Sequence, residues 1–357
     1  MQQFPYDEFD VLVVGGGAGG LATGLTLGEL GINALVVERR PDRSTHPRAT
    51  ALTAATIELM RGWGIESQVR RAGFMTRPVL SLRSCLVSPE LDRIPMREHV
   101  WTCAQDRLEP ILAERTCVAG TPVVYGWEVT QVQADEDGVR ATVMERITGA
   151  AGQMRVRFLV GADGAYSRVR SQVGIRLSRS RSHGDWLSIL FRSPLRSYTG
   201  DPPCLVYGIT NTDPFGVIVP TDATDRWIRG LPWHPEAGER LEDYDVTSCT
   251  ALIRSAVGVP ELPVAILEVQ SFAMVAALAD RYREGRVLLV GDAAHIFTPS
   301  SGMGLNVALQ DGVTAAHCLA RVIKDGDAPD ALEAYEAERR PVTEKLLASD
   351  LADQEEI

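Results

Sequence analysis

The first forty residues alternate apolar runs with a glycine-rich break. Residues 9–14 form a short run rich in β-branched side chains, and apolar positions recur at helical spacing over residues 21–30, after a cluster of five glycines. A second apolar run, residues 33–37, ends at Glu38, 18 residues past Gly20. Strand, turn, helix and strand at this spacing predict one βαβ unit of a nucleotide-binding fold.

The pattern then changes to strands that follow one another without helices. Residues 121–134 form one run, Asp137 and Gly138 form a hairpin turn, and residues 139–144 alternate apolar with polar side chains before a return over 154–160. This order predicts an antiparallel meander. A simple NAD dehydrogenase would instead continue with alternating strands and helices.

A separate antiparallel sheet is predicted further along the chain. Short strands rich in aromatic and β-branched residues occur between residues 186 and 272, with prolines between them. Residues 75–96 are expected to add strands from earlier in the sequence. One amphipathic helix, 246–257, covers part of this sheet. The predicted strands are 186–192, 205–210, 215–219 and 227–231.

A second strand, loop and helix site lies near the C-terminus. Residues 287–290 form a buried type of strand, the sequence Gly-Asp-Ala-Ala-His follows at 291–295, and a loop with Pro299, Gly302 and Gly304 leads into a helix from Leu305 to residue 323. A last helix is expected to end near Leu347.

Composition and charge exclude several classes of protein. The 357 residues are 45% hydrophobic and 23% charged, as expected of a globular α/β chain. A net charge of -11 disfavours binding to nucleic acid or to anionic lipid. The six cysteines show no CxxC and no metal-ligand spacing, which predicts no metal site and favours a reducing cytoplasm. No stretch reaches about 18 uninterrupted apolar residues, so no membrane span is expected.

The glycine cluster has a definite chemistry. Gly15 permits the tight turn, Gly17 lets the main chain approach a pyrophosphate, and Gly20 lets the helix pack closely on the strand. Amides at the start of that helix then face the anion, and Glu38 accepts hydrogen bonds from a ribose. The alternative is a glycine-rich turn beside a surface glutamate. The motif by itself does not separate FAD from NAD.

Three segments, 13–20 with Glu38, 161–170 and 291–306, occur in this order together with Arg48 in His-Pro-Arg-Ala and Gln105 in Cys-Ala-Gln-Asp. Their arrangement resembles the group A flavoprotein monooxygenases, the para-hydroxybenzoate hydroxylase-like family that includes many aromatic polyketide hydroxylases. The resemblance implies an α/β fold, with a Rossmann-like FAD-binding domain and β-meander plus an antiparallel-sheet substrate domain. The expected bounds are 1–74, 99–178 and 281–357 for the FAD-binding domain, and 75–98 and 179–280 for the substrate-binding domain.

The resemblance also assigns cofactor contacts. The glycine turn cradles the FAD pyrophosphate, Glu38 holds the adenosine ribose, Val129 lies near the adenine, and Asp292 binds a ribityl hydroxyl. Asp163 and Gly164 lie where both FAD and the nicotinamide coenzyme pass. The start of the helix that begins at Gly304 and Leu305 faces the flavin pyrimidine. The full set of expected FAD-binding residues is Gly15, Gly17, Ala18, Gly19, Gly20, Glu38, Arg39, Arg48, Gln105, Val129, Asp163, Gly164, Asp292, Pro299, Gly304, Leu305 and Asn306.

Several of these residues have an ordinary structural alternative. Arg48 is also typical of a surface loop, and Gln105 and Asp292 are also typical of helix caps. Arg39 and Arg40 follow the FAD-type Glu38, so they are expected to be exposed or to face FAD. His295 is interpreted as structural, and no catalytic residue is assigned. Thr298 stands where many relatives carry a second proline.

The activity that the resemblance implies uses the flavin as reagent. NADPH or NADH reduces FAD, dioxygen adds at C4a, and the hydroperoxyflavin hydroxylates a bulky aromatic substrate, polyketide-like or phenolic. Epoxidation and Baeyer-Villiger oxidation stay open, as do an FAD-dependent reductase or dehydrogenase and a noncatalytic FAD-binding protein. Six aromatic residues either line the substrate pocket or belong to the core: Trp186, Phe191, Tyr207, Phe215, Trp227 and Trp233.

Overall fold

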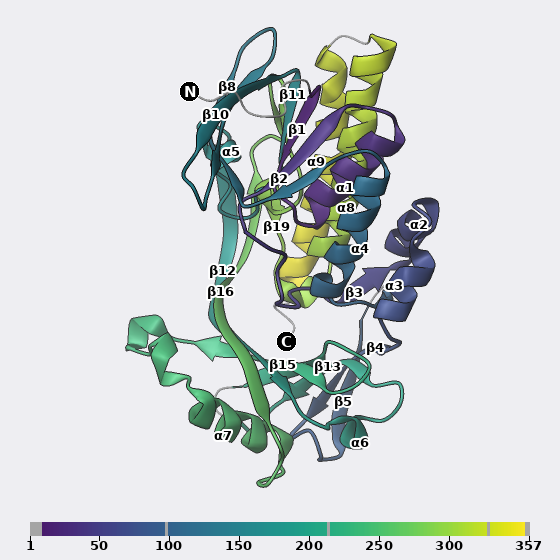
Figure 1. Ribbon diagram of the computed structural model, residues 1–357. Coiled ribbons are helices and arrows are strands. Elements are labelled where there is room, and N and C mark those ends of the chain that lie inside the picture. Colours follow the sequence, from purple (N-terminus) through teal and green to yellow (C-terminus); the bar gives the residue numbers. More distant parts are fainter. Residues whose placement is uncertain (1–8, 97–98, 213–214, 327–328, 354–357) are drawn as a thin grey trace. The chain divides into compact units, whose positions relative to one another are not determined.

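The computed structural model describes residues 9–96, 99–212, 215–326 and 329–353, and within these ranges the side chains of 99–100, 179–183, 329 and 351–353 are left out of the description (Figure 1). The chain forms two compact units, each built from separate stretches of sequence. Unit 1 comprises Met1–Ser44, Glu109–Arg181 and Val275–Ile357, and unit 2 comprises Thr45–Leu108 and Ser182–Met274.

Unit 1 is built on a six-stranded sheet. Five adjacent strands run parallel, and the sixth is an antiparallel strand at one edge. Its central strand, β1 (Val11–Val14), pairs with β2 (Ala34–Glu38) on one side and with β11 (Phe158–Gly161) on the other. All four residues of β1 are buried, as expected of a parallel strand covered on both faces. The other strands are β7 (Val123–Tyr125), β18 (Val287–Leu289) and the antiparallel edge strand β17 (Arg283–Glu284).

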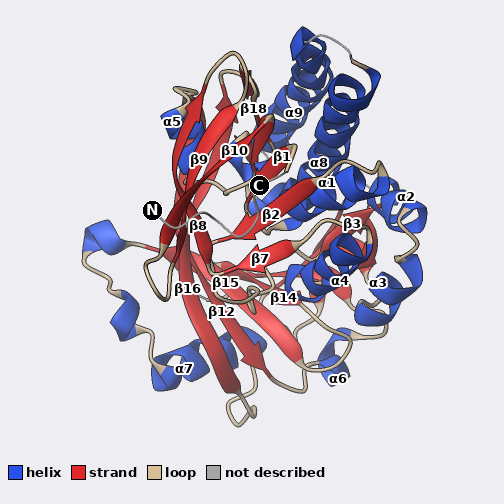
Figure 2. Ribbon diagram, turned by 45° about the horizontal axis from the view of Figure 1, so that its top comes forward, coloured by secondary structure: helices blue, strands red, loops and turns tan. Residues whose placement is uncertain are grey.

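Two helices of unit 1 pack against each other through small residues. Helix α1 (Ala18–Glu29) connects β1 to β2, and α8 (Gly304–Ala320) lies beside it in both ribbon views (Figures 1 and 2). A Cβ added at Gly312 of α8 would lie 2.5 Å from the carbonyl oxygen of Gly19, so the two backbones meet without an intervening side chain. Unit 1 also holds α5 (Arg168–Gln172), α9 (Glu333–Asp353) and the π-helical turn Arg321–Asp325.

The predicted meander is present as a three-stranded antiparallel sheet in unit 1. It consists of β8 (Trp127–Ala134), β9 (Val139–Glu145) and β10 (Ala151–Val156). The turn between β8 and β9 forms because Asp135 Oδ1 accepts hydrogen bonds from the amides of Asp137, at 3.0 Å, and Gly138, at 2.9 Å. Val139, Ala141 and Val143 alternate inward and are fully buried.

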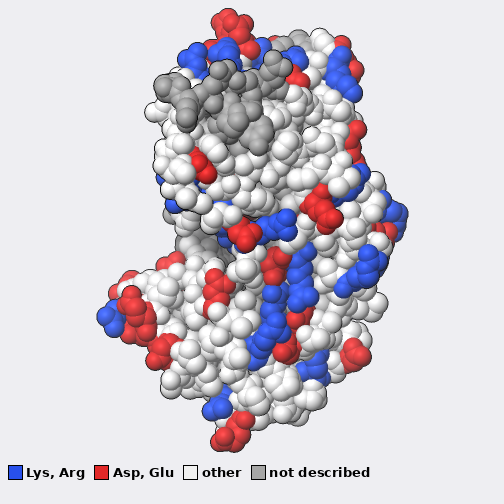
Figure 3. All heavy atoms as spheres, viewed as in Figure 1, with Lys and Arg blue, Asp and Glu red and all other residues white. Residues whose placement is uncertain are grey.

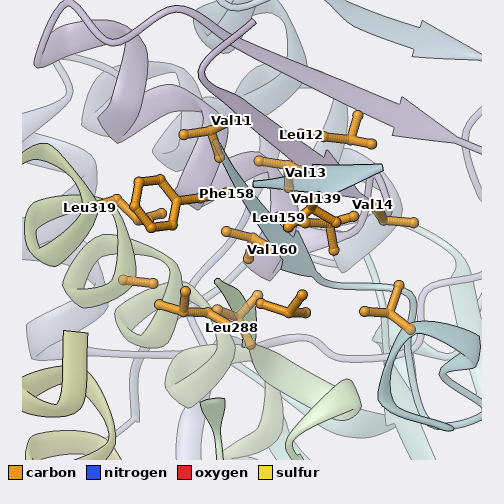
Figure 4. Packing of buried hydrophobic residues seen from close by; sticks show 14 of the residues in the cluster. Val11, Leu12, Val13, Val14, Val139, Phe158, Leu159, Val160, Leu288 and Leu319 are labelled. Atoms are coloured by element: carbon orange, nitrogen blue, oxygen red, sulfur yellow. The ribbon is translucent and has the colours of Figure 1, made fainter. Parts of the chain in front are cut away.

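The core of unit 1 joins the parallel sheet, the meander and the helices. Val11, Val13, Phe158 and Leu288 from neighbouring strands point into one cluster, which Leu319 of α8 completes (Figure 4). Burial of these side chains supplies the main driving force for folding of this unit, because apolar surface removed from water stabilises by roughly 25 cal/mol per Å².

Unit 2 contains most of a larger sheet with the order β16-β12-β15-β14-β13-β4-β5. The pairs β12–β15, β14–β15, β13–β14 and β4–β5 are antiparallel, whereas β13 and β4 are parallel. Helix α7 (Val246–Val257) contributes Cys249, Ile253, Ala256 and Val257 to the core that covers one face. The strands are β4 (Arg77–Arg83), β5 (Glu90–Pro95), β12 (Leu177–Arg192), β13 (Cys204–Ile209), β14 (Gly216–Pro220), β15 (Arg226–Trp233) and β16 (Ala265–Ala279).

Shorter elements complete unit 2. A two-stranded antiparallel ladder joins β3 (Ala51–Thr53) to β6 (His99–Thr102). Helices α2 (Ala54–Gly62), α3 (Glu66–Ala72) and α6 (Arg196–Thr199) follow the chain, and α4 (Gln105–Val118) contains the point at which the chain passes into unit 1.

Two elements differ from the prediction. The last helix, α9, was predicted to end near Leu347 but continues to Asp353. Leu347 and Asp350 are both buried, so packing extends along this last part of the helix. Strand β16 was not predicted, since its apolar and polar residues alternate only in part. Residues 45–74 and 99–108 group with unit 2, although they were expected with the FAD-binding domain. Which unit binds FAD and which binds substrate stays a prediction.

The surface carries both signs of charge. Acidic and basic side chains are interspersed on the face drawn in Figure 3. Several form exposed ion pairs, such as Arg61 with Glu66 at 2.8 Å, which contribute little to stability in water. None of the helices in the described ranges combines the length and hydropathy that crossing a bilayer requires.

Candidate cofactor site

The glycine turn between β1 and α1 is shaped by two close backbone contacts. Gly15 has φ +117°, and a Cβ there would lie 2.2 Å from the carbonyl oxygen of Ala162. A Cβ at Gly20 would lie 1.9 Å from the carbonyl oxygen of Gly15. Both positions therefore exclude any larger residue, which confirms the tight turn predicted at Gly15.

Gly17 differs from these two glycines because it borders open space. The atom nearest to a Cβ placed at Gly17 is Glu109 Oε1, at 3.9 Å, and no side chain in the described part of unit 1 caps the start of α1. The first amides of α1 surround the space that the absence of a side chain leaves at Gly17. This space forms a cradle that a Cβ would fill. A diphosphate fits this cradle, since a helix N-terminus favours an anion.

Glu38 lies at the end of β2, where its carboxylate reaches the glycine turn. Oε2 accepts the amide of Gly16 at 2.7 Å, and Oε1 accepts the amide of Arg40 at 2.9 Å. The side chain is half-buried, whereas Arg39 is exposed. These contacts hold the carboxylate beside the cradle, and its contact with a ribose stays a prediction.

The segment 161–170 forms a capped turn at the start of α5. Asp163 Oδ2 accepts the amides of Arg168, at 2.7 Å, and Val169, at 3.1 Å, while Oδ1 accepts the Ser167 hydroxyl. The Asp163 carboxylate thus has a structural task. Gly164 has φ +83° and no heavy atom within 4 Å of its added Cβ among the described residues, so its main chain is open to a ligand.

Arg170 connects two of the motif segments, a contact that the sequence analysis missed. Nη1 donates to the carbonyl oxygen of Ala293 at 3.0 Å, and Nη2 donates to that of Ala165 at 2.9 Å. The side chain is buried, and this burial lowers the pKa of its guanidinium. The only local signal was an arginine on the short helix that follows Ser167. This signal could not predict the contact, because the partner, Ala293, lies 123 residues away.

The segment 291–306 turns from β18 into α8. Gly291 has φ +58°, and Asp292 is exposed between buried Gly291 and Ala293, so it lies on the outside of the turn. The Asn306 side-chain amide donates to the carbonyl oxygen of Gly302 at 3.0 Å. No side chain within the described ranges caps α8, whose first residues are Gly304, Leu305 and Asn306.

The loop at residues 297–303 bends before α8. Pro299 is exposed at the start of a short 3-10 turn, Pro299–Ser301, and Gly302 has φ +63°. The positive φ at Gly302 reverses the chain into the helix, which a residue with a Cβ adopts only at a cost.

His295 is buried and paired. Its Nε2 lies 2.5 Å from Asp311 Oδ2, and Asp311 also accepts Arg339 Nε at 2.8 Å and the amide of Gly291 at 3.2 Å. Burial alone raises the pKa of Asp311, but the charges and hydrogen bonds of His295 and Arg339 outweigh it and hold the pKa below its usual value. This environment agrees with the structural interpretation of His295.

The remaining expected contacts lie elsewhere. Arg48 and Gln105 belong to unit 2, where the amide of Gln105 donates to the carbonyl oxygen of Ala49 at 2.8 Å. These two residues are thus brought close together, and Arg48 is exposed. Val129 is buried in the core of unit 1, so an adenine contact would have to come from its main chain.

A second cluster that the sequence analysis missed lies in unit 2. His46 Nδ1 is 3.0 Å from Glu268 Oε2, and His46 Nε2 is 3.0 Å from Ser188 Oγ. This buried histidine fixes the loop that carries Arg48. Because its partners are 222 and 142 residues away, no local pattern could have found them.

The six aromatic residues of unit 2 divide into core and partly accessible positions. Phe191, Tyr207 and Trp227 are fully buried in the cluster with α7, so for these three the core interpretation is correct. Trp186 and Trp233 are half-buried, and Phe215 is 40% exposed.

Comparison with known proteins identifies the family. The sequence profile of the FAD binding domain family matches residues 8–350. The chain belongs to this family. A putative polyketide hydroxylase of Streptomyces coelicolor is 36% identical over 353 residues, which is 95% of this chain and 56% of that protein. The chain therefore spans little more than half the length of this relative.

Two solved structures share the fold of this FAD-binding protein. The flavin-dependent monooxygenase PieE, solved with FAD and substrate, has a TM-score of 0.92 and 29% identity, covering 98% of this chain and 64% of its own. Aklavinone-11 hydroxylase, solved with FAD and aklavinone, has a TM-score of 0.89 and 33% identity, covering 98% of this chain and 69% of its own. The predicted fold class and the FAD cofactor are thereby confirmed.

Proposed function

We propose that this protein is an FAD-dependent monooxygenase that hydroxylates a bulky aromatic compound of the polyketide type. The observation that carries the proposal is that the likeness to FAD-and-substrate complexes extends over both units and is not confined to the glycine turn. A glycine turn with Glu38 alone would fit any dinucleotide enzyme.

The residues of unit 1 fit FAD at four points. The uncapped start of α1 and Gly17 would hold the diphosphate, Glu38 the adenosine ribose, and Asp292 a ribityl hydroxyl. The start of α8 would face the flavin pyrimidine, where helix-terminal amides stabilise negative charge. Bound FAD, once reduced, supplies the activation of dioxygen, and the protein binds, orients and excludes water.

The electron donor in this proposal is NADPH or NADH, which docks transiently. Unit 1 is the FAD-binding part, and the sheet of unit 2 supports the aromatic substrate. All six cysteines are free, as expected in a reducing cytoplasm, where we place the enzyme.

The test is rapid mixing under controlled oxygen. The FAD-loaded protein is reduced anaerobically with NADPH, and separately with NADH, then mixed with oxygenated buffer and a polycyclic phenol such as aklavinone. We expect bleaching of the flavin absorbance, followed by reoxidation that yields a substrate carrying one added oxygen atom, measured by mass spectrometry.

Two outcomes contradict the proposal. Bleaching followed by reoxidation that yields only hydrogen peroxide, with aklavinone and with other polycyclic phenols, favours a reductase or dehydrogenase. Failure of both coenzymes to bleach bound FAD favours a noncatalytic FAD-binding protein.

A further inference from the structure

The C-terminal helix α9 carries a buried stripe that includes two charged residues. Arg339, Thr343, Leu347 and Asp350 are spaced by four, four and three residues, which places them on one face of the helix. Their exposed fractions are 5%, 0%, 5% and 4%. Charged side chains are seldom buried unless they are paired. The groups that pair with Arg339 and Asp350 therefore show what this face of α9 holds in place.

The first end of the stripe holds the start of the 291–306 segment. Arg339 Nε donates to Asp311 Oδ1 at 2.8 Å, and Asp311 Oδ2 accepts the amide of Gly291 at 3.2 Å. One turn earlier on α9, the Tyr335 hydroxyl donates to the carbonyl oxygen of Leu289 at 2.6 Å. Helix α9 therefore fixes the chain on either side of Val290, directly before Asp292.

The middle of the stripe is apolar. Leu347 packs in a buried cluster with Ala276, Phe297 and Val307. Phe297 is the first residue of the loop that leads to α8, and Val307 lies in the first turn of that helix. This contact sets the distance between α9 and the loop.

The second end of the stripe holds the loop itself. The Thr298 hydroxyl lies 2.8 Å from both carboxylate oxygens of Asp350, and the Thr298 amide donates to Oδ2 at 3.2 Å. Thr298 is 1% exposed. Hydrogen bonds to a buried carboxylate are stronger than those between neutral groups. The hydrogen bond that the backbone amide of residue 298 donates requires a residue other than proline at this position.

We propose that Asp350 is a positioning residue for FAD, and that α9 holds the segment 291–304 in its cofactor-binding conformation. Asp292 lies between the two anchored positions, Gly291 and Thr298. Pro299 directly follows Thr298, and the first amides of α8 lie between Thr298 and Val307. The positions of these groups therefore depend on the contacts of α9 with Thr298 and Val307 and, through Asp311, with Gly291. The inference rests on the cofactor part of the proposed function, not on hydroxylation.

The experiment titrates FAD into the apoprotein of the full chain and follows quenching of flavin fluorescence. Asp350→Asn removes the charge and one acceptor with little change of shape, and we expect its Kd for FAD to rise about tenfold, the effect of losing one charge-assisted hydrogen bond. The matched control is Glu344→Gln, the same change on the same helix at a carboxylate that is 62% exposed. It is expected to bind FAD like the unchanged protein.

Variants at Thr298 keep the test informative if Asp350→Asn fails to fold. Thr298→Ser retains the hydroxyl and the amide and is expected to keep the Kd, whereas Thr298→Val and Thr298→Pro are expected to raise it, the proline more because it also removes the amide. Hydrogen exchange of the amides of residues 300–306 in the apoprotein is expected to accelerate in the same order.

The outcomes separate the two proposals. A variant set whose Kd and exchange rates equal those of the unchanged protein overturns the positioning role. A lower apoprotein Tm with an unchanged Kd also overturns it, since that result indicates a purely structural contact. Failure of the unchanged protein to bind FAD would overturn the proposed function as well.

Discussion

Gly17 and Gly20 lie three residues apart, yet a methyl group added at each meets different surroundings. At Gly20 the new carbon would lie 1.9 Å from a carbonyl oxygen of the turn, whereas at Gly17 the nearest atom is 3.9 Å away and belongs to a glutamate side chain. Gly17 also has φ -80° and ψ -179°, which alanine adopts without strain. Gly20 is thus required by the fold, whereas the described surroundings of Gly17 leave room for a methyl group, which agrees with its proposed place at the diphosphate.

This difference predicts that the two alanine variants separate folding from cofactor binding. Gly20→Ala is expected to destabilise the apoprotein by about 1–3 kcal/mol, the usual cost of overpacking, because the two nearest atoms belong to the backbone of Gly15. Gly17→Ala is expected to change apoprotein stability by less than about 0.5 kcal/mol and to weaken FAD binding about tenfold or more. Urea unfolding and an FAD titration measure the two effects.

Equal loss of stability in both variants would contradict this prediction. So would full FAD affinity in a well-folded Gly17→Ala protein, because the added methyl group would then not lie in the path of the diphosphate.

At the scale of elements, the contact between α1 and α8 decides whether the two motif segments meet. A Cβ at Gly312 would lie 2.5 Å from the carbonyl oxygen of Gly19 and 2.8 Å from the amide nitrogen of Thr23. Since both are backbone atoms of α1, the helices would have to separate. The small residue on α8 therefore serves the position of the glycine turn on α1.

Gly312→Ala tests this packing. Alanine favours a helix by about 1 kcal/mol over glycine, but overpacking costs about 1–3 kcal/mol, so the variant is expected to be less stable, with a lower midpoint in urea. Gly62→Ala in α2 is the matched control, because its Cβ meets no described atom within 4 Å. The control is expected to be neutral or slightly more stable; a stabilised Gly312→Ala protein would show that the helices can move apart at no cost.

At the scale of the whole molecule, the six cysteines differ in how accessible they are to solvent. Cys117 is exposed, Cys85 and Cys318 are half-buried, and Cys103, Cys204 and Cys249 are buried. Burial raises the pKa of Cys103 to about 12 and that of Cys249 to about 11. Because the thiolate is the nucleophile, a raised pKa lowers reactivity below that pH.

Alkylation of the native protein at pH 8 is therefore expected to modify Cys117 first and to leave Cys103 and Cys249 unmodified until a denaturant is added. Peptide mass spectrometry after timed quenching measures the order. Labelling of Cys103 at the rate of Cys117 in the folded protein would mean that the core of unit 2 opens on the timescale of the reaction.

Local patterns predicted much of this molecule. The β1, turn, α1 and β2 unit, the Asp137-Gly138 hairpin and the helix Val246–Val257 follow from apolar periodicity and from the conformations open to glycine, which depend on neighbours within a few residues. The close contact at Gly20 is likewise local, because the carbonyl oxygen that excludes a Cβ there belongs to Gly15 of the same turn. The atom that excludes a Cβ at Gly15 belongs instead to Ala162, which is distant in sequence.

Only the tertiary structure decided the long-range contacts. The bonds from Arg170 to Ala293, from Asp350 to Thr298 and from His46 to Glu268 join residues 123, 52 and 222 positions apart. An arginine, aspartate or histidine in a helix or loop looks the same in sequence whether water or a buried partner satisfies it. Which of these occurs depends on the surfaces that packing brings together, and packing is a property of the whole chain.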